Sequence, residues 1–194
     1  NIVIDGLEFR HTGGYGSGLN IPGGTDVTVQ NCVVHDNDYM GIRVGNASRV
    51  IIRHNVSTAN GYGISVGTCT DVLIHGNDVS WNIVDGIVVS YTAANIYVEQ
   101  NYIHHHMLWG HPDNMQTHHG VTNMWVEDNV ILASGQSFMI EQTDGLHFRN
   151  NIITGCGGYM LHGGADNQTL IGNTLAFSGY GLLSLGGTGY TLYD

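Results

Sequence analysis

Short apolar runs alternate along the chain with turns rich in Gly, Asn, Asp and Ser, and the pattern repeats about every 22 residues. In the first run of each repeat every second residue is apolar, which is typical of a strand with one buried face. These first runs are 27–29, 50–52, 72–74, 96–98, 124–126 and 146–148. A second short run follows each of them, as in Gly41–Val44 and Gly63–Val66. Each repeat therefore predicts at least two strands, and 22 residues leave no room for a crossover helix.

One asparagine recurs after the first run of each repeat, at intervals of 24, 22, 24, 28, 22 and 22 residues. The seven positions are Asn31, Asn55, Asn77, Asn101, Asn129, Asn151 and Asn173. Asn tolerates the left-handed backbone of a tight turn, and stacked amides can form hydrogen bonds from coil to coil. We therefore expect one Asn ladder along a β-solenoid whose successive coils pair in parallel.

Repeats such as Val72-Leu-Ile-His-Gly-Asn77 and Ile96-Tyr-Val-Glu-Gln-Asn101 resemble those of the pectin-lyase-like superfamily of right-handed parallel β-helices. The resemblance covers the whole chain. It implies an all-β fold, with residues 1–194 as one right-handed parallel β-helix of about eight coils and no long helix. Its members include polysaccharide lyases, glycoside hydrolases, uronate epimerases, tailspikes and adhesins, so the fold alone does not select an activity. We expect an extracellular or cell-surface protein.

Both ends of the sequence lie inside the repeat pattern. The chain opens within a strand at Asn1–Ile4, and Thr191–Asp194 reads as the first strand of another coil. Because an open solenoid end exposes unpaired backbone groups, we expect the chain to be a segment of a longer protein. The alternative is a homo-oligomer, or end-to-end stacking on partner chains.

Composition narrows the partners. The chain has no lysine, five arginines and 16 acidic residues, for a net charge of −11. Nucleic acid binding needs a basic stripe and is disfavoured, and so is a strongly anionic polysaccharide unless a bound cation supplies positive charge. The chain contains no run of 18 apolar residues, so no membrane span is predicted. The odd number of cysteines and the absence of C-x-x-C spacing predict a structural role for Cys32, Cys69 and Cys156.

The coil at 101–129 is the longest, with 28 residues, and six of the 12 histidines lie within 104–119. Insertions in solenoids go into loops, where binding sites are commonly built. Within this coil, His111-Pro-Asp113-Asn-Met-Gln116 resembles an H-x-D-x-x-Q pattern of carbohydrate-active β-helix proteins. This resemblance implies a site centred on Asp113, Gln116 and His111.

The strand register adds two further carboxylates to this site. Asp85 lies at the register of Asp113 in the preceding coil, so the two groups are expected to be about 4.8 Å apart. Two carboxylates this close cannot both ionise without penalty, so the pKa of one should rise, as a general acid requires. Glu141, two coils from Asp85, is expected to lie roughly 10 Å from it, a separation that suits an inverting glycosidase.

Uronate elimination or epimerisation is the competing chemistry. A base would remove the proton next to the carboxylate, and His111 or His118 could supply a suitable imidazole. Oxygen ligands for a possible Ca²⁺ would come from Asp85, Asp113 and Gln116. The absence of arginine from the inserted coil counts against this chemistry, because Arg149 is predicted on another face.

Two other interpretations of this coil stay open. Asp113 could simply cap a turn, Gln116 could belong to a polar ladder, and the histidines could form a solvated loop. Alternatively, His104 and His106, expected on one strand face, could bind a transition metal.

An outward column of the first strand contains Leu73, Tyr97, Trp125 and His147 in consecutive coils. The rings could form a platform for sugars, or they could pack against a neighbouring subunit. Tyr97, Trp109 and Trp125 are therefore candidate substrate contacts. The sequence favours a secreted enzyme acting on a polysaccharide. The alternative is a non-catalytic fibre, tailspike or adhesin module with a structural or glycan-binding role.

Overall fold

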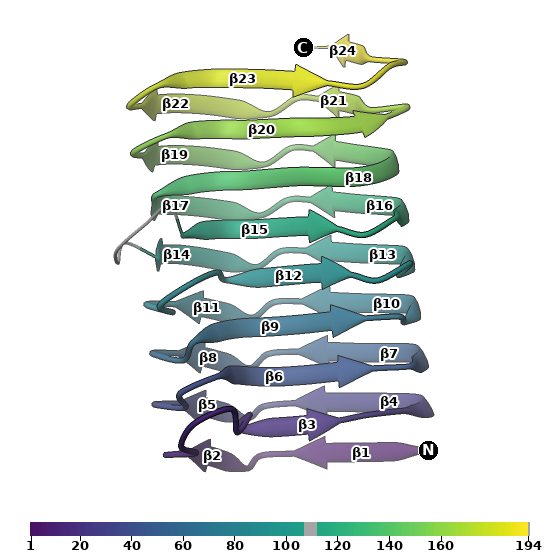
Figure 1. Cartoon of the computed structure of the whole chain (residues 1–194), viewed down its shortest axis with the longest axis vertical. Helices are drawn as coiled ribbons and strands as arrows, with labels where there is room; N and C mark the ends of the chain where they lie inside the picture. Colours follow the sequence, from purple (N-terminus) through teal and green to yellow (C-terminus); the bar gives the residue numbers. More distant parts are fainter. Residues whose placement is uncertain (107–111, 194) are drawn as a thin grey trace.

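The computed structural model of the protein describes residues 1–106 and 112–193. Within these ranges every regular element is a β-strand, and no helix in them could cross a membrane. The strands wind into a rod of stacked coils, with the two chain ends at opposite ends of the rod (Figure 1). Equivalent strands of successive coils pair in parallel. The predicted all-β parallel solenoid of about eight coils is therefore confirmed.

Three faces, which we name A, B and C, surround the core, and each receives one strand from nearly every coil. Face C is the one nearest the viewer in Figure 1. Face A contains β1 (Ile2–Asp5), β4 (Gly24–Gln30), β7 (Ala47–Arg53), β10 (Thr70–His75), β13 (Ala94–Glu99), β16 (Val121–Glu127), β21 (Thr169–Ile171) and β24 (Thr191–Tyr193). Face B contains β2 (Glu8–Arg10), β5 (Val33–His35), β8 (Val56–Thr58), β11 (Asp78–Ser80), β14 (Tyr102–His106), β17 (Val130–Ser134), β19 (Ile152–Cys156) and β22 (Thr174–Ser178). Face C contains β3 (Leu19–Ile21), β6 (Met40–Gly45), β9 (Tyr62–Gly67), β12 (Ile87–Ser90), β15 (Asp113–His118), β20 (Tyr159–Asp166) and β23 (Gly181–Gly186). The long strand β18 (Gln136–Arg149) starts on face C beside β15 and ends on face A beside β16.

The alternating residues of faces A and C fill the core, as the sequence pattern predicts. On β10, Val72 and Ile74 are fully buried while Leu73 points outward. The sequence pattern did not reveal the strands of face B, because many of them have three residues and only one inward side chain, such as Val34 in β5. The three cysteines are free thiols buried among these side chains, so their predicted structural role is confirmed.

A ladder of buried asparagines runs along the corner between faces A and B. The side-chain oxygen of Asn101 accepts hydrogen bonds from the backbone N–H and the Nδ2 of Asn77, at 2.9 and 3.0 Å. The Nδ2 of Asn101 in turn donates to Asn129 Oδ1 in the next coil at 3.0 Å. The ladder members are Asn55, Asn77, Asn101, Asn129, Asn151 and Asn173.

Asn31 is not a member of this ladder, contrary to the prediction. The buried Cys32 occupies the ladder position, and its backbone N–H donates to Asn55 Oδ1 at 3.0 Å. Asn31 instead has a left-handed backbone, with φ of 54°, and it precedes the ladder position. His54 and Gln100 precede their ladder residues in the same way, with φ of 54° and 53°. The tight turn and the ladder amide therefore belong to adjacent residues, so the expectation that one Asn does both is wrong.

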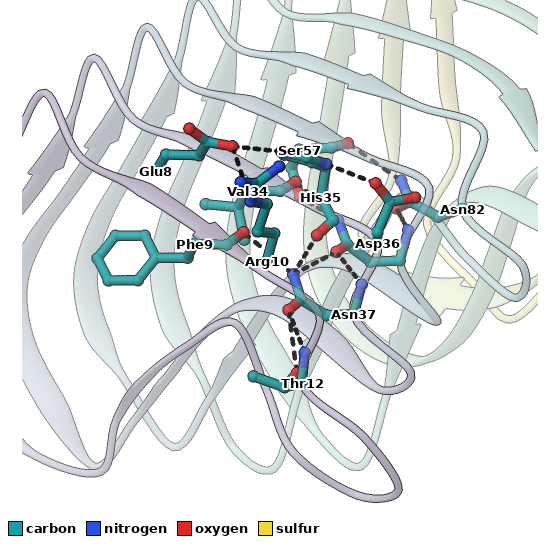
Figure 2. Close-up of polar contacts among 11 residues, drawn as sticks. Glu8, Phe9, Arg10, Thr12, Val34, His35, Asp36, Asn37, Ser57 and Asn82 are labelled. Carbon is teal, nitrogen blue, oxygen red and sulfur yellow. Dashed lines mark hydrogen bonds and ion pairs between the residues drawn. The ribbon is translucent and has the colours of Figure 1, made fainter.

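A second ladder, which the sequence pattern did not reveal, lies at the corner between faces B and C. Asn37 Nδ2 donates to Asn60 Oδ1 at 2.8 Å, and the Asn60 N–H donates to Asn82 Oδ1 at 3.0 Å. At its start the Thr12 N–H and hydroxyl both donate to Asn37 Oδ1 (Figure 2). His106 continues the ladder, because its Nδ1 accepts the Asn82 N–H at 3.1 Å. Burial lowers the pKa of His106 to about 3, so this imidazole is neutral and structural.

Candidate functional site

A groove of about 310 Å³ runs along face C. Its floor is one outward column, in which Arg43 pairs with Ser65, Ser65 with Val88, and Val88 with Gln116. The strand ends and the turns after them contribute polar groups from Ser90, Tyr91 and His118, among others. The groove therefore extends across four coils and ends at the strand of the inserted coil.

Of the predicted site residues that the structure describes, Gln116 and His118 line this groove. Both lie on β15, where Met115 and Thr117 point into the core and leave Gln116 and His118 on the outer surface. The predicted alignment of Met115 and Thr117 with Ile87 and Val89 is confirmed. An amide and an imidazole thus face the same open space.

His118 is half-buried at the end of the groove. Its Nδ1 lies 3.0 Å from Nδ1 of His119, and its ring meets the Tyr91 ring edge-on at 5.5 Å. Burial lowers the pKa of His118, and the neighbouring His119 lowers it further, while the charge of Glu141 opposes both effects. The imidazole is therefore neutral near pH 7. When its Nδ1 carries the hydrogen shared with His119, its Nε2 has a free lone pair.

Asp113, the first residue of β15, and Asp85, two residues before β12, are both buried and lie side by side outside the groove. The Asp113 N–H donates to Asp85 Oδ1 at 2.9 Å, so their predicted pairing across one coil is confirmed. Burial above all, and then the charges of Asp85 and Glu141, raise the pKa of Asp113 to about 8. The predicted rise in pKa is thus confirmed, although burial rather than mutual repulsion is its main cause. Asp113 is only 2% exposed, so its carboxyl group does not face the groove.

Glu141 is not at the register of Asp85 and Asp113. It follows Ile140, which pairs with Thr117, and it therefore lies beside His118. Gln136 is the residue of β18 that pairs with Asp113. The expected separation of roughly 10 Å was based on the spacing between coils alone. Glu141 also lies five residues further along the strand than Gln136, an offset of roughly 16 Å. Coil spacing alone therefore does not give the separation of Asp85 and Glu141, and the carboxylate pair for an inverting glycosidase stays a prediction.

The aromatic column lies on face A, away from the groove. Tyr97 and Trp125 stack with centroids 4.6 Å apart and planes at 6°, and His147 covers the other face of Trp125 at 5.3 Å. Rings that stack on one another in this way present edges to the solvent. The column is confirmed, and Tyr97 also lines an open apolar pocket with Leu73 on this face, so the role of Tyr97 and Trp125 as sugar contacts stays a prediction. Its contribution is packing, at about 0.5–1.5 kcal/mol per pair.

The histidines of the inserted coil are divided among different faces. His104 lies on face B, where its Nε2 is 3.1 Å from Asp78 Oδ1, while His106 is in the core. His105 has φ of 60°, which breaks the strand alternation between them, so the expectation that both share one face is wrong. His111 and Trp109 lie outside the described residues.

Arg43 is the groove residue that sequence reasoning missed. It is exposed on the same outward column as Gln116, three coils earlier. The sequence carried the signal, because Arg43 follows Ile42 as Gln116 follows Met115. Arg149 lies on face A, 3.6 Å from Glu127, as predicted.

Among the described residues, no group of three or more His, Cys, Asp or Glu side chains has an arrangement that could hold a metal ion. Of the proposed oxygen ligands, Gln116 faces the groove while Asp85 and Asp113 are buried at its margin. The Ca²⁺ site stays a prediction.

The three-faced coil, the parallel pairing and the internal Asn ladders define a parallel β-helix. A family profile described as "Right handed beta helix region" matches residues 1–119. The chain therefore belongs to the right-handed β-helix family, and the resemblance found in its repeats is confirmed.

Two epimerases are among the solved structures that are similar to this chain. A double mutant of the periplasmic alginate epimerase AlgG gives a TM-score of 0.78 and 17% identity, over 88% of this chain and 45% of that chain. The A-module of the Azotobacter vinelandii mannuronan C-5 epimerase AlgE4 gives a TM-score of 0.59 and 13% identity, over 88% and 54%. The chain thus spans about half the length of these structures, and identities this low establish the fold alone. A search of curated protein sequences found no significant match.

Proposed function

We propose that this chain acts on a polysaccharide containing uronic acid units, by proton transfer in the face C groove. One observation carries the proposal: a neutral imidazole, His118, and an amide, Gln116, face one open groove that crosses four coils. A linear ligand fits a groove of this shape. We also propose an extracellular or cell-surface location, and the similarity to two alginate epimerases supports a uronate as the reacting unit.

In the proposed reaction, Nε2 of His118 takes the proton from the sugar carbon next to the carboxylate. The electron pair of that C–H bond moves onto the carboxylate, and the Gln116 amide donates a hydrogen bond to the oxygen that gains charge. In elimination, the bond from the neighbouring carbon to the glycosidic oxygen breaks as a C=C double bond forms, and the leaving oxygen takes the proton held by His118. In epimerisation, a proton from solvent adds to the opposite face of the carbon, and His118 releases its proton to solvent.

Hydrolysis fits this groove less well. Glycosidases place two carboxyl groups on either side of the scissile bond. Among the described residues, no Asp or Glu lines the groove. We therefore propose that Asp85 and Asp113 position the start of β15 and do not contact the sugar.

The test uses a panel of neutral and uronic polysaccharides in deuterated water, with and without EDTA. Elimination is followed by the ultraviolet absorbance of the unsaturated product, hydrolysis by reducing ends alone, and epimerisation by deuterium incorporation seen by NMR. We expect His118→Ala to lose roughly 10²–10⁴-fold in rate, as is typical of a general base. His75→Ala, on face A, is the matched control and should keep the wild-type rate.

Unchanged turnover in His118→Ala would refute the assigned base. Binding without any turnover would instead support the alternative of a glycan-binding fibre or adhesin module. Loss of turnover in EDTA that Ca²⁺ restores would support the predicted cation.

A further inference from the structure

The local charge of the groove differs in sign from the charge of the whole chain. The chain has 16 acidic residues and a net charge of −11. Among the described residues that line the groove there is no Asp or Glu, and Arg43 is the one residue with a permanent charge. A charged ligand at the Arg43 end of this groove would therefore meet one guanidinium, while the charge of Glu141 acts at the His118 end.

Arg43 also differs from the other four arginines in having no partner within the described residues. Three arginines form ion pairs: Arg10 with Glu8, Arg49 with Asp26, and Arg149 with Glu127. Arg53 donates two hydrogen bonds to the side-chain oxygen of Gln30. A guanidinium has five N–H donors arranged to match a carboxylate or sulfate, and those of Arg43 are available to a ligand.

The position of Arg43 along the groove is fixed by the strand register. Three coil intervals separate Arg43 from Gln116, or about 14 Å along the rod axis. The positions between them are occupied by Ser65 and Val88, which carry no charge. Because one pyranose unit lengthens an extended chain by about one coil spacing, the two ends of the groove would contact different sugar units.

We propose that Arg43 binds the anionic substituent of a sugar unit about three positions away from the unit that lies against Gln116 and His118. The inference rests on the proposed function and deepens it. Arg43 then determines specificity for a carboxylate or sulfate at one distant position, and the units between need no charge. A chain must have at least about four units to reach Arg43, and shorter chains are bound without this contact.

The experiment measures kcat/KM for uronic acid oligosaccharides of increasing length, in the wild type and in Arg43→Gln. We expect the wild type to gain roughly tenfold in kcat/KM at the length that first reaches Arg43, which is the size expected for a hydrogen bond to a charged group. Arg43→Gln should lose this gain and keep the rate on shorter chains. Arg53→Gln, on face A, is the matched control and should behave as the wild type.

Binding measurements test the Arg43 subsite independently of the proposed reaction. Dissociation constants for the same oligosaccharides are measured with the His118→Ala variant, with and without Arg43→Gln. An Arg43-dependent step in affinity without any turnover would support the subsite and refute the reaction. Turnover whose dependence on length is the same in Arg43→Gln would refute the subsite and leave the reaction standing.

Oligosaccharides with one modified unit identify the anion. A carboxylate or a sulfate placed only on the distant unit should each be compared with a neutral chain. Preference for either anion that disappears in Arg43→Gln and weakens at high salt supports the proposal and names the group. Equal affinity for the neutral chain would overturn it.

Discussion

Removing one amide from the middle of the Asn ladder should destabilise the rod strongly, and Asn101→Ala is the test. Asn101 is 2% exposed, and its side chain takes part in four hydrogen bonds. Its Oδ1 accepts from the N–H and the Nδ2 of Asn77, and its Nδ2 donates to Ile74 O and Asn129 Oδ1. The alanine variant keeps the backbone and loses all four contacts.

The magnitude follows from which groups lose their partners. The Asn77 N–H becomes a buried donor without its acceptor, which costs about 1–3 kcal/mol. The other three groups keep part of their bonding, for example Asn77 Nδ2 through its bond to Ile52 O, and each loses about 0.5–1.5 kcal/mol. We therefore expect the free energy of unfolding to fall by roughly 3–6 kcal/mol.

Equilibrium urea unfolding is the assay, with Asn20→Ala as the control. Asn20 is exposed on β3, and it makes no side-chain hydrogen bond within residues 1–106 and 112–193, so its removal should cost less than about 0.5 kcal/mol. Because each coil contacts only its neighbours, hydrogen exchange should show the loss of protection centred on the coils of Asn77 and Asn129. A difference of less than about 1 kcal/mol between the two variants would show that the ladder does not stabilise the rod.

Three other substitutions test separate contacts. Because the pKa of Asp113 is raised to about 8 in the folded state, the folded chain keeps a proton that the unfolded chain loses above the ordinary pKa of 3.8. The free energy of unfolding should therefore fall by roughly 1.4 kcal/mol per pH unit between about pH 4 and 8. Asp113→Asn should remove this slope in urea titrations, and an unchanged slope would contradict the assignment. His35 Nδ1 lies 2.6 Å from Asp36 (Figure 2), and this hydrogen bond raises the pKa of His35. Its stabilising effect should be complete below about pH 6.5 and lost as pH rises through the raised pKa, and Asp36→Asn should lower the pKa measured by NMR; no change would exclude Asp36 as the cause. Cys32→Asn should add a ladder amide beside Asn55 and stabilise the protein by about 1 kcal/mol in urea unfolding, and stability no greater than that of Cys32→Ala would count against the ladder register.

The fold could be predicted because its signals are local and repeated. Alternation at period two identifies the strands of faces A and C in each coil, and the 22-residue period excludes a helix between them. The strands of face B were not predicted, because a strand of three residues with one inward side chain, such as Val34, is too short to show alternation. The second ladder was missed for a related reason, because the column of Asn37, Asn60 and Asn82 continues with His106 and not with another Asn.

The ladder shows how the register could have been read more accurately. Ladder residues lie three positions after the last inward residue of face A, as Asn77 follows Ile74. Counting from Val29 leads to Cys32 and not to Asn31. The buried apolar residues fix the register, because a shift by one residue would turn every side chain of the strand to the other face. The presence of an asparagine alone does not fix the register.

The candidate site could be predicted only in part, because its members come from different coils. Gln116 and His118 were found because they lie in the one irregular coil. Arg43 lies in a regular coil, and only alignment of the columns places it with Gln116. Ring orientation in the Tyr97 and Trp125 column depends on side-chain packing, which strand alternation does not determine.

Net charge was the least informative guide to the ligand. The charge of −11 argues against an anionic polysaccharide only if the acids act on the ligand, and charges beyond about 8–10 Å are largely screened at physiological salt. Several carboxylates are also engaged on other faces, such as Asp26 with Arg49 and Glu127 with Arg149. A ligand in the groove would instead meet Arg43 at one end, three coils away from His118 and the neighbouring Glu141. The composition therefore limits how many charges the ligand can carry along the rod, but it permits an acidic unit at the position of Arg43.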